Sequence, residues 1–420
     1  MNIPRRLTPA LALGLGLSLA ACGTTSTPAS TPSATTAASS APAAPSPRPT
    51  QEVENPQPRL AITYDGGILI VDATSFEQLA EYKAEGYQGL SEAGDGRHLL
   101  VSNEEGFRLL DMGAWTVSHG DHGHAHVTTP LLTDVTFPGK KAGHAVAHGN
   151  TTTLFFDGTG DYKVYDPRLL SDKGAPKTTD YKTEHPHHGV ALVLEDGTRI
   201  ETIGKDKERP GARVFDASGK EIAKSEDCPG VHGEGVAADH RVVLGCTNGL
   251  LIFDGKSSFS KATSPDAYGR IAKVSATEKS PIVLGDYKVD KDAKPERSKR
   301  VALVDTAAAT MKLVELPASY SYGTLGRGPA GEALVLGTDG TLRVIDPVAG
   351  TITKEVKVTG EWDLSANWQD PVPAMRVLGK TAYITEPAAK KVHVVDLTSW
   401  SLTRSGDLTQ TPRGIHGVAG

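Results

Sequence analysis

Histidines are the residues in this sequence whose number and spacing suggest chemistry. The chain has 14 His among 420 residues, and most of them lie in short clusters between His98 and His240. Imidazole nitrogens and carboxylate oxygens are common protein ligands of Zn²⁺, and imidazole also binds copper and nickel. The clusters therefore predict a metal-binding protein, with Zn²⁺ as the expected ion.

The clusters are of two kinds. One is a Gly-rich run over 119–126, which predicts a mobile loop that captures and exchanges metal. The others open predicted strands, which favours a rigid site where those strands converge. The candidate ligands of the exchange loop are His122, His124 and His126, supported by His119 and Asp121. The candidate ligands of the rigid site are His144, His188, His232 and Glu234, with His148 close by.

Each cluster has an interpretation without metal. A solvated polar loop would also account for 119–126, and a hydrogen-bonded polar channel would account for the convergent histidines. Isolated residues such as His98, His240 and His393 are typical of surface or packed positions.

The elements that must position these histidines are short strands. From Leu60 onward, β-branched runs alternate with Gly, Asp and Asn turns, and no long amphipathic helix is evident. Four strands recur every 40–50 residues or so, which is typical of a β-propeller blade. The fold class is therefore predicted to be all-β, a propeller of about eight blades, with seven blades and two packed β-sandwiches as alternatives. The innermost strands are expected to begin near Tyr87, His144, His187, Val231, Tyr268, Tyr322 and Trp362.

The two ends of the body complement each other. Residues 60–83 have room for three strands, and 413–419 read as one inner strand with nothing after it. Pairing these segments would complete a blade and remove the exposed edges. The innermost strands would then line a channel. Period-2 alternation puts His232 and Glu234 on one face, and likewise His144 and His148.

The N-terminus predicts export. Arg5-Arg6 precede an apolar run that is too short to span a bilayer, and Leu19-Ala20-Ala21-Cys22 resembles a bacterial lipobox. We expect residues 1–22 to be a lipoprotein signal peptide with Cys22 as the lipid attachment site; an ordinary signal peptide is the alternative. Residues 23–58, rich in Ser, Thr, Ala and Pro, are expected to be a disordered spacer. The propeller would then span 59–420, and the protein would be lipid-anchored on the outer face of the cell membrane, or periplasmic.

The remaining cysteines are Cys228 and Cys246. In an oxidising compartment a disulfide between them is the natural assignment, and two buried free thiols are the alternative. If Cys22 carries lipid, no thiolate is left to bind metal.

Charge argues against a nucleic-acid partner. The formal net charge is −6 and no basic surface is indicated.

At these histidines the sequence resembles the AztD-type zinc metallochaperones, exported β-propeller proteins that pass zinc to the solute-binding protein of a zinc ABC transporter. The resemblance covers about residues 60–420. It implies zinc sites built from these His and acidic positions, and direct transfer to a partner. The matching stretches are Gly113–Val117 running into His119–His122, His144–Gly149, Pro186–Val190 and Cys228–Glu234, with Cys246 eighteen residues after Cys228. The lipobox and long spacer depart from the periplasmic members of the family.

Three functions are compatible with these features. The first is a zinc chaperone without enzymatic activity, whose partner is a zinc-specific solute-binding protein. The second is a zinc-dependent hydrolase in which Glu234 would act as general base. The third is a protein-interaction scaffold with incidental metal, because propellers can host all three.

Overall fold

A computed structural model describes residues 48–420. Residues 1–47 lie outside the described part, so the predicted signal peptide, Cys22 and most of the spacer are not covered. Among the described residues, no helix has the length and apolar character needed to cross a bilayer.

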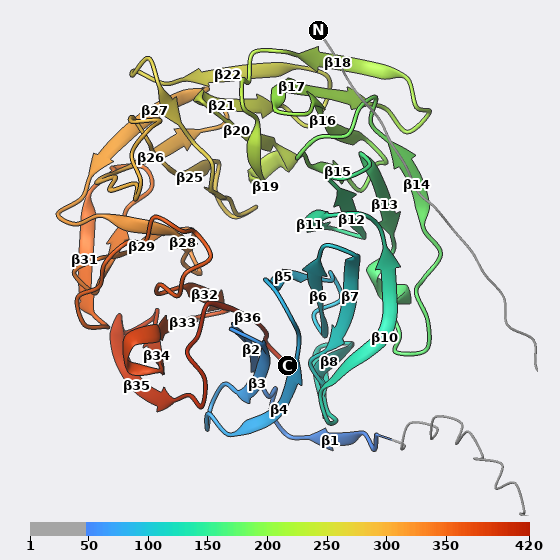
Figure 1. The fold of residues 1–420 in the computed structure, drawn as a ribbon, viewed down its shortest axis with the longest axis vertical. Helices are drawn as coiled ribbons and strands as arrows, with labels where there is room; N and C mark the ends of the chain where they lie inside the picture. Colours follow the sequence, from blue (N-terminus) through green and yellow to red (C-terminus); the bar gives the residue numbers. More distant parts are fainter. Residues whose placement is uncertain (1–47) are drawn as a thin grey trace, which may run out of the picture. The chain divides into compact units, whose positions relative to one another are not determined.

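Within residues 48–420 the strands form eight sheets built on four antiparallel strands, arranged as blades around a ring (Figure 1). An all-β propeller of eight blades is thus confirmed. The strands of each blade are given from the innermost outward. Blade 1 has β36 (Gly414–Val418), β2 (Arg59–Tyr64), β3 (Gly67–Asp72) and β4 (Gln78–Lys83), and blade 2 has β5 (Gly89–Glu92), β6 (His98–Asn103), β7 (Gly106–Asp111) and β10 (Leu131–Pro138). Blade 3 has β11 (Ala142–His148), β12 (Thr151–Phe156), β13 (Asp161–Tyr165) and β14 (Thr179–Lys182), and blade 4 has β15 (Ala191–Val193), β16 (Arg199–Lys205), β17 (Glu208–Phe215) and β18 (Glu221–Ser225).

The second half of the ring follows the same order. Blade 5 has β19 (His232–Val236), β20 (Val242–Cys246), β21 (Asn248–Phe253) and β22 (Phe259–Thr263), with β23 (Gly269–Arg270) beside β21. Blade 6 has β24 (Val274–Ser275), β25 (Ile282–Asp286), β26 (Arg300–Asp305) and β27 (Thr310–Glu315), and blade 7 has β28 (Tyr320–Arg327), β29 (Ala333–Gly337), β30 (Thr341–Ile345) and β31 (Ile352–Lys357). Blade 8 has β32 (Met375–Leu378), β33 (Thr381–Glu386), β34 (Lys391–Asp396) and β35 (Ser401–Asp407). Short 3₁₀ turns are η1 (Pro167–Leu169), η2 (Ala238–His240) and η3 (Pro387–Ala389).

The predicted closure is confirmed. β36 pairs antiparallel with β2, in a register that sets Leu60 opposite Gly417 and completes blade 1. The central strands of the blades are apolar and buried, as β2 and β20 show throughout their length. Their side chains pack between adjacent blades and form the core clusters; one such cluster joins Leu192 of blade 4 to Leu244 of blade 5.

The innermost strands define two ends of the ring. We call the end at which they begin the start face and the opposite end the end face. The ends of several innermost strands, including His148, Leu378 and Gly417, line one cavity of about 640 Å³ at the end face.

Three local details differ from the sequence prediction. The innermost strand of blade 8 begins at Met375 rather than near Trp362, because 360–374 form an irregular connection. Blade 6 likewise begins at Val274 rather than near Tyr268. The third concerns the spacer, whose last residues were predicted to be disordered. In the structure β1 (Gln51–Val53) pairs with β9 (His122–Val127), so the folded body begins before the predicted boundary at 59. Backbone pairing needs no apolar side chains, and composition alone therefore missed it.

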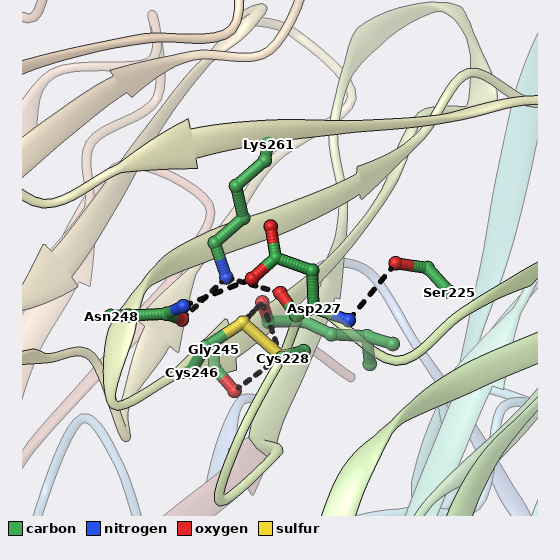
Figure 2. Close-up of a disulfide and its surroundings, with 8 residues drawn as sticks. Ser225, Asp227, Cys228, Gly245, Cys246, Asn248 and Lys261 are labelled. Atoms are coloured by element: carbon green, nitrogen blue, oxygen red, sulfur yellow. Dashed lines mark hydrogen bonds between the residues drawn. A yellow bond between two sulfur atoms is a disulfide. The ribbon is translucent and has the colours of Figure 1, made fainter.

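The predicted disulfide is present. Cys228 and Cys246 are bonded and buried between blades 4 and 5 (Figure 2). Nearby, Lys261 Nζ donates to the Asp227 carbonyl and to Asn248 Oδ1, each at 2.6 Å. The disulfide thus ties the segment that leads into β19 to the strand that pairs with it.

Candidate metal centres

Three imidazoles meet at the start face, and each comes from a different blade. His144 lies near the beginning of β11, His188 just precedes β15, and His232 is the first residue of β19. One ring nitrogen from each lies within 4.8 Å of the others, and the ring centroids are 4.9–5.6 Å apart. Two nitrogens that bind one zinc ion at about 2.0–2.1 Å lie at most about 4 Å apart, so only small ring rotations are needed. We call this cluster the channel site.

The Nδ1 atom of each imidazole already has a hydrogen-bond acceptor. His144 Nδ1 lies 3.0 Å from Glu234 Oε2, and His188 Nδ1 lies 2.5 Å from Asp157 Oδ2. His232 Nδ1 donates to the Ala272 carbonyl at 2.9 Å. An imidazole that donates from Nδ1 presents its Nε2 lone pair, and this is how histidine ligands of metals are usually oriented. The arrangement therefore offers three Nε2 atoms to one ion.

This geometry changes the expected role of Glu234. The sequence suggested that Glu234 is a ligand, or a general base in a hydrolase. In the structure its carboxylate is engaged by His144 and is not part of the three-residue ligand cluster. Glu234 thus orients His144, as Asp157 orients His188.

The pKa values of His232 and His144 are shifted in opposite directions. Burial lowers the pKa of His232 to about 4, so this imidazole is neutral at pH 7 and available to a metal. Burial also acts to lower the pKa of His144, but the adjacent Glu234 carboxylate outweighs it and the pKa is raised. The pKa of Glu234 is lowered: burial opposes this shift, but His144 outweighs it. His144 and Glu234 therefore stabilise each other's charged forms in a partly buried pair, and a proton on the His144 nitrogen that binds the ion must leave when a cation binds.

A β-bulge next to His232 sets the direction of its side chain. Gly233 has φ of +75°, and the strand register shifts between His232 and Glu234. A Cβ at Gly233 would lie 2.2 Å from the Ala272 carbonyl oxygen, so a side chain there would disrupt the acceptor of His232. The backbone amide of Ala272 in turn donates to Asp286 at 2.6 Å. The period-2 argument from sequence does not hold across this bulge, although both side chains reach the site.

His148 is not brought into the channel site. It lies at the other end of β11, four residues from His144 and roughly 13 Å along the strand. Its Nδ1 lies 3.2 Å from Glu278 Oε1, and its ring is near His240. Sharing one face of a strand is therefore not enough to place two histidines on one ion.

The second cluster lies on a β-hairpin rather than on a loop. Strands β8 (Ala114–His119) and β9 are joined by the two-residue turn Gly120-Asp121, which sets His119 opposite His122. His119, His122 and His124 each offer a nitrogen within 4.8 Å of the others. We call this exposed cluster the hairpin site. Strand alternation explains the correction, because a short turn between two pairing segments forms a hairpin.

Carboxylates also orient this cluster. Asp121 Oδ1 lies 3.1 Å from His122 Nδ1, and Glu52 Oε1 lies 2.7 Å from His124 Nδ1. His126, also predicted as a ligand, is not part of the cluster. Its ring stacks on Trp115 with centroids 5.4 Å apart, and it lies four strand residues from His122.

The two sites lie on opposite faces of the ring. The hairpin interrupts the connection between β7 and β10, and it leaves the blade where Asp111 pairs with Leu131. Asp111 also pairs with His98, and the turn before His98 follows the end of β5. The hairpin therefore projects from the end face, where Trp115 and Thr116 line the cavity. Where the sequence predicted a mobile loop, the structure has a hairpin at the face opposite the channel site.

A third group, His98 with Asp111 and Asp172, also has ligand-like spacing. Arg48 and Arg97 pair with both of these carboxylates. Burial acts to lower the pKa of His98, but Asp172 and Asp95 raise it to about 9. Two guanidinium groups already compensate these carboxylates, so the group forms an ion-pair network.

Sequence reasoning missed three groups that support the sites: Asp157, the Ala272 carbonyl and Glu52. Asp157 ends a strand before a Gly-rich turn, a context in which Asp usually caps the turn. A main-chain carbonyl has no sequence signal. Glu52 lies in a segment that reads as spacer.

The chain is 28% identical over 367 residues to the zinc chaperone AztD from Citrobacter koseri, and the match covers 84% of each chain. Two solved structures of Citrobacter koseri AztD, one of them apo, match with TM-scores of 0.73 and 0.74 at 25% and 26% identity; they cover 87% of this chain and 99–100% of theirs. The resemblance to AztD-type proteins is confirmed.

More distant likenesses concern the AztD-type fold alone. The dihydro-heme d1 dehydrogenase NirN matches with a TM-score of 0.53 at 13% identity, covering 86% of this chain and 75% of its own. No protein-family model matches the sequence.

Proposed function

We propose that this protein is a zinc metallochaperone, which captures zinc outside the cytoplasm and transfers it to the solute-binding protein of a zinc ABC transporter. The observation that carries the proposal is the channel site. Three imidazoles from three blades present Nε2, and each Nδ1 is satisfied by Glu234, Asp157 or the Ala272 carbonyl. This donor set suits Zn²⁺, and Cys228 and Cys246, joined in a disulfide, supply no competing thiolate within residues 48–420.

Delivery requires that the ion can leave. Each cluster supplies three histidines, whereas a tetrahedral ion takes four ligands, so a fourth position remains for a group from a partner. An incoming ligand can bind before the first imidazole is released, which lowers the barrier to exchange. The exposed hairpin is the natural point of contact, because its imidazoles can be reached without opening the ring.

The relatives support the same role. The matched curated protein is described as a zinc chaperone, and its match spans most of both chains. We extend to this protein the transfer function and propose that Zn²⁺ is carried as cargo.

We also propose that the protein is exported and lipid-anchored through Cys22. The lipobox-like sequence supports this location. The disulfide is consistent with an oxidising compartment.

A transfer assay tests the proposal. Protein loaded with one equivalent of zinc is mixed either with the purified solute-binding protein or with a chelator of equal affinity, and the loss of metal is followed over time. Faster loss to the protein partner is expected, because transfer through a complex avoids the free ion. Equal rates would leave only passive buffering, and failure to bind zinc at all would exclude the metallochaperone.

A further inference from the structure

The segment that precedes the first blade crosses the hairpin site. Residues 48–58, which we call the strap, include β1, and its pairing with β9 sets Glu52 opposite His126. From there the Glu52 side chain reaches diagonally to His124, with 2.7 Å between Oε1 and Nδ1. A residue far from the hairpin in sequence thus contacts one of its three candidate ligands.

The strap is fastened at both ends. Arg48 pairs with Asp111 at the base of the hairpin. At the other end, Arg59 Nη1 donates to the carbonyls of Met112 and Thr128 at 2.7 and 2.8 Å. Between these anchors Gln51 and Glu52 are exposed, so little apolar burial holds β1 against β9. Its docking depends on backbone pairing and on the contact between Glu52 and His124.

We propose that Glu52 is a positioning residue of the hairpin site, and that zinc binding and docking of the strap reinforce each other. The inference rests on the proposed zinc-binding function. By accepting a hydrogen bond from His124 Nδ1, Glu52 leaves Nε2 as the metal-binding atom and fixes the direction of the ring. A bound cation withdraws electrons from the imidazole, which strengthens the hydrogen bond from Nδ1 to the carboxylate.

The coupling must be reciprocal. If the docked strap raises the affinity of the hairpin for zinc by some factor, zinc raises the docking equilibrium by the same factor. The hairpin site is therefore a composite of two segments, and its occupancy is transmitted to the strap. Removing an outer-shell partner of a metal-bound histidine typically weakens metal binding by about 10–100-fold. Because Glu52 is exposed, we expect the lower end of that range.

The test uses the full-length protein carrying His232→Ala, so that the hairpin dominates zinc binding. Glu52→Gln is compared with Glu54→Gln, which removes the same charge two residues away at an exposed position. Zinc affinity is measured by competition with a chromophoric chelator, and hydrogen exchange of the amides at 51–53 is measured with and without zinc.

With Glu54→Gln, zinc should bind normally and slow exchange in β1 by about tenfold; with Glu52→Gln, affinity should fall by about tenfold and the effect of zinc on exchange should disappear. If the role of Glu52 were purely structural, Glu52→Gln would change hydrogen exchange at 51–53 in the absence of zinc. The further slowing of exchange caused by zinc would then be unchanged. Equal affinities in the two variants, or equal zinc effects on exchange, would overturn the inference. If the unsubstituted protein passes zinc to its partner while the Glu52→Gln and Glu54→Gln variants behave alike, only the role of Glu52 fails. If the unsubstituted protein binds no zinc, the proposed function fails as well.

Discussion

The channel site and the hairpin site use the same chemistry in different surroundings. Both gather three imidazoles, and both set carboxylates against Nδ1 atoms. The channel ligands come from three neighbouring blades, so the site exists only when these blades are packed together. The hairpin ligands come from two paired strands and are largely exposed. We infer that tight binding requires packing between blades, whereas exchange requires only a local element.

The channel site and the hairpin site also differ in their exposure to solvent. In the channel site a partly buried carboxylate raises the pKa of His144, while burial lowers the pKa of His232. Water has a high dielectric constant and weakens the attraction between charges, so the exposed carboxylates of the hairpin act more weakly on its histidines. Affinity and its dependence on pH should therefore be concentrated at the start face.

Replacing a channel ligand should have the largest effect. His232→Ala removes one of three converging nitrogens, so zinc affinity of the channel site should fall by more than about 100-fold, beyond the usual effect of an outer-shell partner. Chelator competition measures the change, with substitution of the half-exposed His185, His185→Ala, as control. If tight binding survived, the channel site would not be the high-affinity site.

Replacing an orienting carboxylate should have the next largest effect. Asp157→Asn leaves His188 in place but weakens the acceptor of its Nδ1 hydrogen, so affinity should fall by about 10–100-fold. Asp134→Asn, at an exposed position, is the matched control. A loss as large as that for His232→Ala would mean that Asp157 itself binds the metal.

The hairpin should control rate more than affinity. Changing His119, His122 and His124 together to Ala should slow transfer to the solute-binding partner by about tenfold, or ~1.4 kcal/mol in the barrier, and leave channel affinity unchanged. Substitution is preferable to deletion of 119–126, because deletion would also remove the strand that pairs with β1. Stopped-flow measurement of transfer gives the result; an unchanged rate would remove the hairpin from the pathway.

The smallest expected effect is in proton release. The pKa of His144 is raised, so its protonated form is favoured, whereas the pKa of His232, at about 4, leaves that imidazole neutral. Zinc binding should therefore release a proton from His144, and apparent affinity should fall as the pH is lowered. Calorimetry in buffers of different ionisation enthalpy measures this release. Glu234→Gln should reduce it, and a buffer-independent enthalpy would contradict the ion pair.

The fold was predictable because the same pattern of strands and turns repeats along the propeller. Each blade repeats the same alternation of short apolar strands and turns, and errors in one blade do not affect the count. The complementarity of 60–83 and 413–419 then predicted closure, which the pairing of β2 with β36 confirms. Strand starts such as Met375 were missed because long irregular connections carry no periodicity.

The sites were predictable only in part. Position at the start of innermost strands was enough to group His144, His188 and His232. It was not enough to place His148 and His126, since four residues along a strand exceed the reach of one ion. It also could not reveal Asp157 or Glu52, whose roles arise from partners in other segments.

The pairing of β2 with β36 also constrains the order of folding. These strands lie at opposite ends of the described chain, and contacts so remote in sequence form slowly because a long loop must close first. The disulfide spans only 18 positions, and it can form within its own pair of blades before the ring is complete. β36 is thus the strand that joins the two ends of the ring, and refolding should show ring closure as a late phase that follows formation of the individual blades.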